Sequence, residues 1–284
     1  MLRIPLQRLL SARVLLLLAS VSAGAQCERP PDGSITANPN RPTVADPADI
    51  TQIGVVEMEF GWNRTWQRHD IHETDIGNLL KYAMLCDLEI RWNSTIVTGQ
   101  STRGNSEYGV GDNLIGAQWR IVHQSRTFPT LAISYAAKIP TASPAKGLGT
   151  GKTDHAFKFL ASRDVSGFHF DFNTAYILSG RTQSDGYDHD FLVTLSGAHR
   201  IRGPLGITGE LYGYTRLNRD TPGYTSNRWA LTFVATPRLV FDSGIDVGLT
   251  SGAPHKTVIA GFTYSIVDLT AKISRSGRRP SDSK

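Results

Sequence analysis

The sequence has few of the features that mark several other protein classes. Only two of its 284 residues are cysteines, Cys27 and Cys86, which excludes a small fold held together by many disulfide bonds. No heptad pattern persists, which excludes a coiled coil. Charged residues make up only 19% of the chain, but 40% of the residues are hydrophobic. This is enough apolar surface to exclude disorder over most of the chain.

The basic charge of the chain is confined to its two ends. The formal net charge is +5, yet residues 1–25 carry three arginines and no acid, and residues 268–284 also have a net charge of +3. Residues 26–267 are therefore close to neutral. The charge balance gives no reason to expect a nucleic-acid partner.

The N-terminus predicts export from the cytoplasm. A basic stretch is followed by the apolar run Val14–Ala19, and Ala23-Gly24-Ala25 supplies small residues before Gln26. This is the pattern of a signal peptide over residues 1–25, cleaved before Gln26. The apolar run is too short to span ~30 Å of hydrocarbon as a helix, and later apolar runs are broken by polar residues at every second position. A membrane location would therefore require a closed barrel of strands.

Most of the chain alternates between apolar and polar residues with a period of two, which is typical of β-strands. Val56, Met58 and Phe60 share one face, and Glu57 and Glu59 share the other. An irregular, proline-containing leader over residues 26–50 precedes this region and is expected on the periplasmic side. Twelve strands are predicted over residues 53–66, 76–84, 87–98, 108–122, 128–140, 153–163, 167–180, 188–200, 205–217, 226–238, 240–250 and 256–267.

The connections between these strands alternate in length. Longer connections are expected outside the cell, the first two over residues 67–75 and 99–107, and short turns on the periplasmic side. A soluble β-sandwich has no reason to alternate loop length by side, and its core would exclude the charges found on the polar faces. The sequence therefore predicts an all-β fold, a transmembrane antiparallel up-and-down β-barrel of about 12 strands over residues 51–267. Residues 268–284 are expected to form a basic, disordered tail.

Several short motifs occur in a fixed order along this region. They include Gly109-Val110-Gly111-Asp112, Ile139-Pro140-Thr141, Asn173-Thr174-Ala175-Tyr176 and Gly209-Glu210-Leu211-Tyr212-Gly213. In these motifs the chain resembles the outer-membrane channels named for the meta pathway of phenol degradation. The resemblance covers about residues 53–267. It implies passage of small, often aromatic or hydrophobic, molecules across the outer membrane.

Charged side chains on the polar faces are expected to line the barrel lumen. We predict that ten of them set selectivity: Glu57, Glu59, Glu89, Arg91, Arg120, Lys138, Asp171, Glu210, Arg216 and Arg228. In one interpretation these charges surround a wet pore. In the other they form cross-barrel ion pairs that close the lumen, and the sequence does not decide between the two.

Other polar clusters give little evidence of chemistry. One contains His69, His72, Glu73 and Asp75, and another contains Asp185, Asp188, His189 and Asp190. Neither has an established metal-ligand spacing, so both are interpreted as solvated loop tips. A Gly-x-Ser-x-Gly motif is absent. We therefore predict no catalytic residues, no metal and no cofactor.

The predicted function is an outer-membrane channel that passes small solutes passively. A closed structural or adhesive barrel is the alternative, and an outer-membrane enzyme is a third, less favoured interpretation. The expected partners are outer-membrane lipid, a small-molecule solute and the barrel-assembly machinery, and the protein is expected to be a monomer. Cys27 and Cys86 are both expected on the periplasmic side, and whether they pair is left open.

Overall fold

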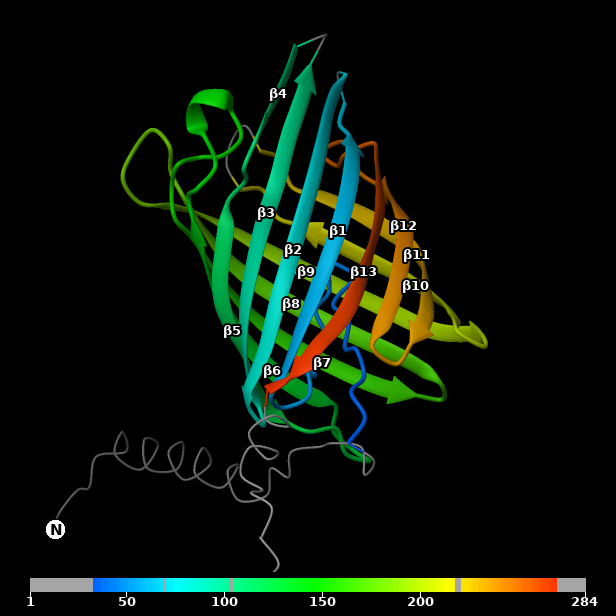
Figure 1. The fold of residues 1–284 in the computed structure, drawn as a ribbon. Helices are drawn as coiled ribbons and strands as arrows, with labels where there is room; N and C mark the ends of the chain where they lie inside the picture. Colours follow the sequence, from blue (N-terminus) through cyan, green and yellow to red (C-terminus); the bar gives the residue numbers. More distant parts are fainter. Residues whose placement is uncertain (1–32, 69, 103–104, 218–220, 270–284) are drawn as a thin grey trace, which may run out of the picture.

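The computed structural model describes residues 33–68, 70–102, 105–217 and 221–269 (Figure 1). The predicted signal peptide and almost all of the predicted basic tail lie outside these residues. No helix in the described part of the chain has the length and apolar character needed to cross a membrane. The elements are β1 (Val55–Trp66), β2 (Ile71–Leu85), β3 (Leu88–Thr102), β4 (Asn105–Gly109), β5 (Asn113–Val122), β6 (Thr130–Ile139), the short 3-10 helix η2 (Pro144–Lys146), β7 (Asp154–Val165), β8 (Phe168–Gly180), β9 (Tyr187–Arg202), β10 (Leu205–Tyr214), β11 (Tyr224–Thr236), β12 (Leu239–Gly248) and β13 (Lys256–Asp268).

The strands form one closed antiparallel barrel. Consecutive strands pair with each other, except β4 with β5, and β1 pairs with β13 to close the ring. Both β4 and β5 pair with β3, at Thr98–Thr102 and Leu88–Ser94 respectively. They are therefore two parts of one interrupted strand, and the barrel has the twelve strands that the sequence predicts.

The alternation of side chains places apolar groups outside and polar groups inside. Trp92 and Trp119 are 45% and 47% exposed on the outer surface, whereas Glu57 and Glu89 on the inward face are fully buried. An apolar exterior around a polar interior suits a barrel surrounded by lipid, because hydrocarbon solvates apolar side chains but not charges. The barrel accordingly has the surface of a membrane-spanning protein.

Two predicted outer loops are shorter in the structure than the sequence predicts. Residues 71–75 belong to β2, and residues 99–102 belong to β3, because the pairing of these strands continues outward to Ile71 opposite Thr102. Short turns at the other end of the barrel agree with the prediction, as at residues 86–87 and 203–204. Cys86 in the first of these turns is disulfide-bonded, and Cys27 lies outside the described residues.

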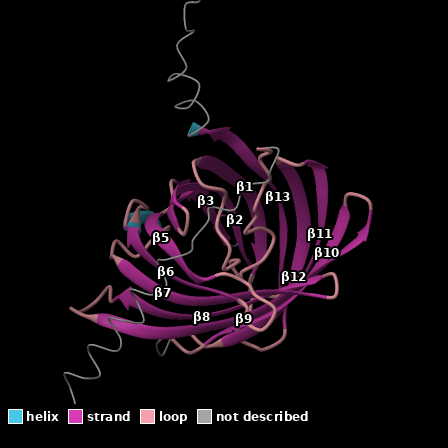
Figure 2. Ribbon diagram, turned by 90° about the horizontal axis from the view of Figure 1, so that it is seen from below, coloured by secondary structure: helices cyan, strands magenta, loops and turns pink. Residues whose placement is uncertain are grey.

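The leader differs most from the prediction. Its described residues form no strand, as expected, but they do not stay on the periplasmic side. Figure 2 shows irregular chain inside the ring of strands, and residues 38–51 bond to side chains of the inner wall. We call residues 38–51 the plug. Its location could not be read from local pattern, because the contacts that hold it come from distant strands.

Candidate functional site

The lumen wall of β1 to β3 carries a buried cluster of charges. Alternation places Glu57 and Glu59 of β1, Lys81 of β2 and Glu89 of β3 on the inward face, all at most 2% exposed. The ammonium group of Lys81 lies 2.8 Å from Glu57 Oε1 and 2.6 Å from Glu59 Oε1. A buried cation between two carboxylates is stable only when all of its donors and acceptors find partners.

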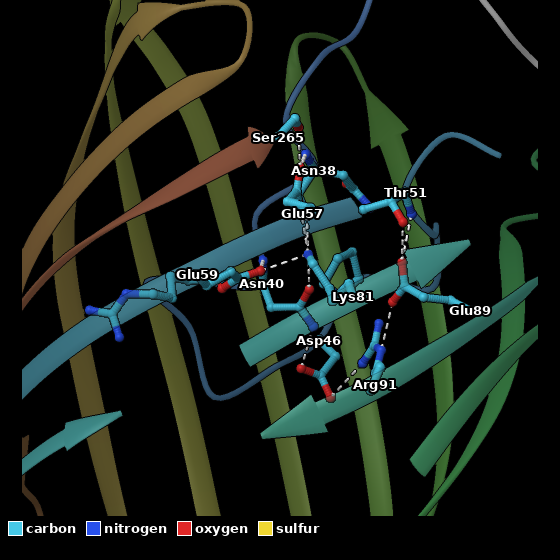
Figure 3. A network of polar contacts seen from close by, with 12 residues as sticks. Asn38, Asn40, Asp46, Thr51, Glu57, Glu59, Lys81, Glu89, Arg91 and Ser265 are labelled. Carbon is cyan, nitrogen blue, oxygen red and sulfur yellow. Dashed lines mark hydrogen bonds and ion pairs between the residues drawn. The ribbon is translucent and has the colours of Figure 1, made fainter. Parts of the chain in front are cut away.

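The plug supplies those remaining partners (Figure 3). Lys81 Nζ donates to the backbone oxygen of Asn38 at 2.6 Å and to Asn40 Oδ1 at 2.7 Å. In return the backbone N–H of Asn38 donates to Glu57 at 2.9 Å, and that of Asn40 donates to Glu59 at 2.8 Å. The buried charges of this wall therefore form a binding site for the irregular backbone of the plug.

The opposite wall holds the plug in the same way. Both carboxylate oxygens of Glu210 in β10 accept plug N–H groups, at 2.8 Å from Val44 and 2.7 Å from Ala45. Asn173 of β8 accepts from the Asp46 N–H at 2.7 Å and donates to its carbonyl oxygen at 2.9 Å. A buried segment without secondary structure needs such partners for its N–H groups. Here the wall side chains provide them.

The proline pattern of the plug explains why irregular chain is tolerated in the lumen. Pro39, Pro42 and Pro47 have no N–H group, so they reduce the number of buried donors that need a partner. The carbonyl oxygen of Pro47 accepts a hydrogen bond from Gln118 Nε2 at 2.9 Å. Proline therefore lowers the number of plug N–H groups that the wall must satisfy.

Ion pairs also link the plug to the wall. Asp46 lies 2.6 Å from Lys158 and 3.5 Å from Arg91. Burial alone would raise the pKa of the Asp46 carboxyl, but these two cations hold it well below its usual range. Arg41 of the plug contacts Asp242 at 2.9 Å. The plug is thus bound electrostatically to β3, β7 and β12.

Eight of the ten predicted lumen residues lie on the inner wall at or near the plug. Seven of them contact it through side-chain atoms: Glu57, Glu59, Glu89, Arg91, Arg120, Glu210 and Arg228. Arg120 pairs with Asp49 of the plug at 3.2 Å, and Asp171 accepts a hydrogen bond from Ser162, whose oxygen in turn accepts from the plug. Neither of the two earlier interpretations of the lumen describes this arrangement. The wall charges bind a segment of the same chain rather than one another across the barrel.

The other two predicted lumen residues lie elsewhere. Lys138 is near the outer end of β6, where it pairs with Asp154 at 2.6 Å and approaches Asp112 at 3.4 Å. Arg216 is exposed in the outer loop after β10, not on a strand facing the lumen. Arg216 lies beyond the strand because β10 ends at Tyr214, three residues earlier than the alternation indicated.

A tyrosine cluster inside the lumen was not predicted. Tyr212 and Tyr214 of β10 and Tyr224 of β11 face inward, and the ring centroids of Tyr214 and Tyr224 are 5.1 Å apart. Val44 of the plug packs against the cluster. The sequence alternation could have indicated this cluster, because Tyr212 and Tyr214 share the inward parity of Glu210. Together these rings give an otherwise polar lumen one aromatic wall.

A polar cavity of about 360 Å³ lies between the plug and the wall of β1 to β3. Its lining includes Arg41 of the plug, Asn63 of β1, Asp75 of β2 and Asn93 of β3. Asp75 was interpreted as part of a solvated loop tip, and this interpretation is wrong, because Asp75 is in a strand and shares the inward parity of Lys81. In the described part of the chain no group of histidine, cysteine and acidic residues could hold a metal ion.

Solved structures with the same fold are outer-membrane proteins that form channels. An outer membrane channel from Pseudomonas putida F1 has 12% sequence identity and a TM-score of 0.59, with 76% of this chain and 97% of that chain covered. The NanC porin has 12% identity and a TM-score of 0.52, covering 74% of this chain and all of the porin. The KdgM porin, solved with disordered oligogalacturonate, has 6% identity and a TM-score of 0.52, covering 74% and 99%.

These likenesses establish the fold, and the sequence itself establishes the family. No curated protein matches the chain. The family model described as "Putative MetA-pathway of phenol degradation" matches residues 40–266, a range that begins inside the plug and ends in β13. The match therefore includes both the barrel and most of the segment that occupies its lumen. The chain belongs to this family of outer-membrane barrels.

Proposed function

We propose that this protein is a channel through which small solutes diffuse when the plug moves aside. The observation that carries the proposal is the way the lumen is closed. The strands pair only with one another, whereas the plug is held by side-chain hydrogen bonds and ion pairs. The plug can therefore leave without breaking any strand pairing of the barrel. A lumen closed by wall side chains alone would have no such movable part.

Two observations support small aromatic molecules as the solutes. The family description refers to phenol degradation, and the rings of Tyr212, Tyr214 and Tyr224 provide an aromatic surface inside the lumen. Aromatic rings attract one another in offset or edge-on arrangements with centroids roughly 4.5–7 Å apart. A phenol could stack on this surface while its hydroxyl group bonds to the polar wall.

The charged residues of the wall would then have two functions. With the plug in place, they bind it. With the plug displaced, Arg91, Arg120 and Arg228 and the acids Glu57, Glu59 and Glu89 line an open lumen. Charged side chains of both signs around a constriction tune the ion preference of a channel. Selectivity of the open channel is accordingly assigned to this set together with Asp171 and Glu210.

Planar-bilayer conductance of the refolded protein tests the proposal. We expect discrete conductance steps that become shorter or smaller when phenol is added, because a bound ring narrows the lumen. Cyclohexanol, similar in size but without the aromatic ring, is the matched control probe. A folded barrel that shows no conductance under any voltage, with the plug intact or weakened, would contradict the proposal.

A closed structural or adhesive barrel is the second candidate, and the filled lumen favours it. The two functions differ in what the outer loops do. If residues 141–152 are deleted, a structural or adhesive barrel should lose surface binding while solute uptake is unchanged. If the protein is a channel, the same deletion should alter solute uptake or leave surface binding unchanged.

The remaining assignments concern the whole protein in the cell. We propose that residues 1–25 are a cleaved signal peptide, that the barrel-assembly machinery inserts the chain, and that the protein is a monomer. N-terminal sequencing of the membrane-extracted protein should begin at Gln26. Light scattering of the protein in detergent should give the mass of a single chain.

A further inference from the structure

The polar cavity beside the plug has one wall without side chains. Gly61 of β1 and Gly77 of β2 lie directly opposite each other in register, and both line the cavity. A β-carbon at Gly61 would collide with the guanidinium group of Arg41. The cavity of about 360 Å³ is therefore formed where two neighbouring strands lack side chains. Pockets of roughly 300–1,000 Å³ hold small molecules.

The charges that line the cavity are not equally compensated. Glu59 is paired with Lys81, Asp46 with Lys158, and Arg41 with Asp242. Asp75 differs from these groups. Its two carboxylate oxygens accept hydrogen bonds from neutral donors, Asn63 Nδ2 at 3.1 Å and Thr98 Oγ1 at 2.6 Å. No lysine or arginine in the described part of the chain pairs with it.

The other polar groups of the cavity are mostly neutral amides and hydroxyls. Asn63 and Asn93 contribute amides from two strands, and Thr95 contributes a hydroxyl group. Amide oxygens accept hydrogen bonds, so they can share the N–H groups of a cation that the carboxylate attracts. The cavity thus combines one uncompensated negative charge with several acceptors in a volume suited to a small molecule.

We propose that this cavity is a binding subsite for small organic cations, in which the carboxylate of Asp75 receives a primary ammonium group. The proposal rests on the channel function proposed above and adds to it a separate subsite for solutes that carry a positive charge. Asp75 is then a specificity-determining residue. The neutral amides of Asn63 and Asn93 orient the bound group without adding charge.

The binding test uses the whole protein in detergent at pH 7 and the probe 2-aminoethanol in its ammonium form. Saturation-transfer NMR should show transfer from protein to probe, and the neutral analogue ethylene glycol should show much less. In Asp75→Asn we expect binding about fivefold weaker, since two unit charges 4 Å apart in water interact by ~1 kcal/mol. The control is Asp188→Asn, because Asp188 of β9 pairs with Arg181 and does not line this cavity. Equal transfer in Asp75→Asn and wild type would overturn the proposal.

Conductance separates the failure of this inference from the failure of the channel function. Under a tenfold potassium chloride gradient, the wild-type channel should prefer potassium, and Asp75→Asn should reduce that preference about fivefold on the same electrostatic argument. An open channel whose ion preference is unchanged by Asp75→Asn overturns the subsite and leaves the channel. A barrel that never conducts overturns the channel, and the NMR result then decides the subsite alone.

Discussion

Glu210→Gln should loosen the plug without altering the barrel. Glu210 accepts two plug N–H groups, at 2.8 Å from Val44 and 2.7 Å from Ala45, and a third hydrogen bond from Thr194 at 2.6 Å. Glutamine has nearly the same shape but only one oxygen. Its NH₂ group would face a plug N–H, so one acceptor is lost and the remaining hydrogen bonds become uncharged.

The size of the effect follows from the hydrogen bonds that change. A hydrogen bond to a charged group contributes about 1.5–3 kcal/mol, and one between neutral groups about 0.5–1.5 kcal/mol. Losing one charged bond and weakening another should cost about 3 kcal/mol, which corresponds to roughly a 100-fold increase in the fraction of molecules with a displaced plug.

Hydrogen exchange measured by mass spectrometry reports this change directly. Peptides that cover residues 38–51 should exchange about 100-fold faster in Glu210→Gln, if opening and closing are fast relative to exchange. Peptides from β8 and β9 should keep wild-type protection, which shows that the barrel is folded. Asp188→Asn should exchange as wild type throughout. Plug protection within a factor of three of wild type, in a variant with an intact barrel, would refute the assignment of Glu210 as an anchor.

Three further outcomes are expected. Lys81→Met should lower the free energy of unfolding by about 3–5 kcal/mol in urea titrations, because it leaves two buried carboxylates without a counter-ion; a loss below 1 kcal/mol would contradict this. Because the pKa of Asp46 is depressed in the folded protein, its contribution to holding the plug should be complete above its ordinary value of 3.8 and be lost as the pH falls below that. The protection of the plug amides, taken relative to their intrinsic exchange rate at the same pH, should therefore fall below about pH 4 in wild type, with a smaller fall in Asp46→Asn. Non-reducing peptide mapping should find the Cys86 peptide linked to the Cys27 peptide, because these are the two cysteines of the chain; recovery of the two peptides unlinked would contradict this pairing.

The wall could be predicted from the sequence because its signal is local. Alternation with a period of two places Glu57 and Glu59 on one face whatever the rest of the chain does. Lys81 has the same parity, yet it was not selected, because the alternation of residues 76–84 is broken by the polar Asn78 on the outer face and the apolar Leu79 on the inner face. Strand ends were less certain, since pairing between β2 and β3 continues through polar residues that resemble a loop.

The plug could not be predicted because its stability comes from remote contacts. Arg41 and Asp242 are 201 residues apart, and Val44 and Glu210 are 166 apart. Within the segment, proline and small polar residues indicate only irregular backbone. The buried acids on the wall were the available clue, because a carboxylate inside a barrel needs a donor. The sequence did not show that the donors belong to the chain itself.

The two ends of the plug are joined to each other, and this determines how the lumen would open. Gln52, the residue after the plug, bonds to the chain that precedes the plug: its side-chain oxygen accepts from the N–H of Thr36 at 3.0 Å and its Nε2 donates to the carbonyl oxygen of Ser34 at 3.2 Å. The segment therefore enters and leaves the lumen through the same end of the barrel, as a loop whose two ends are joined. Such a loop withdraws as one unit rather than residue by residue. The current through a single molecule should accordingly switch between two levels, without intermediate current levels.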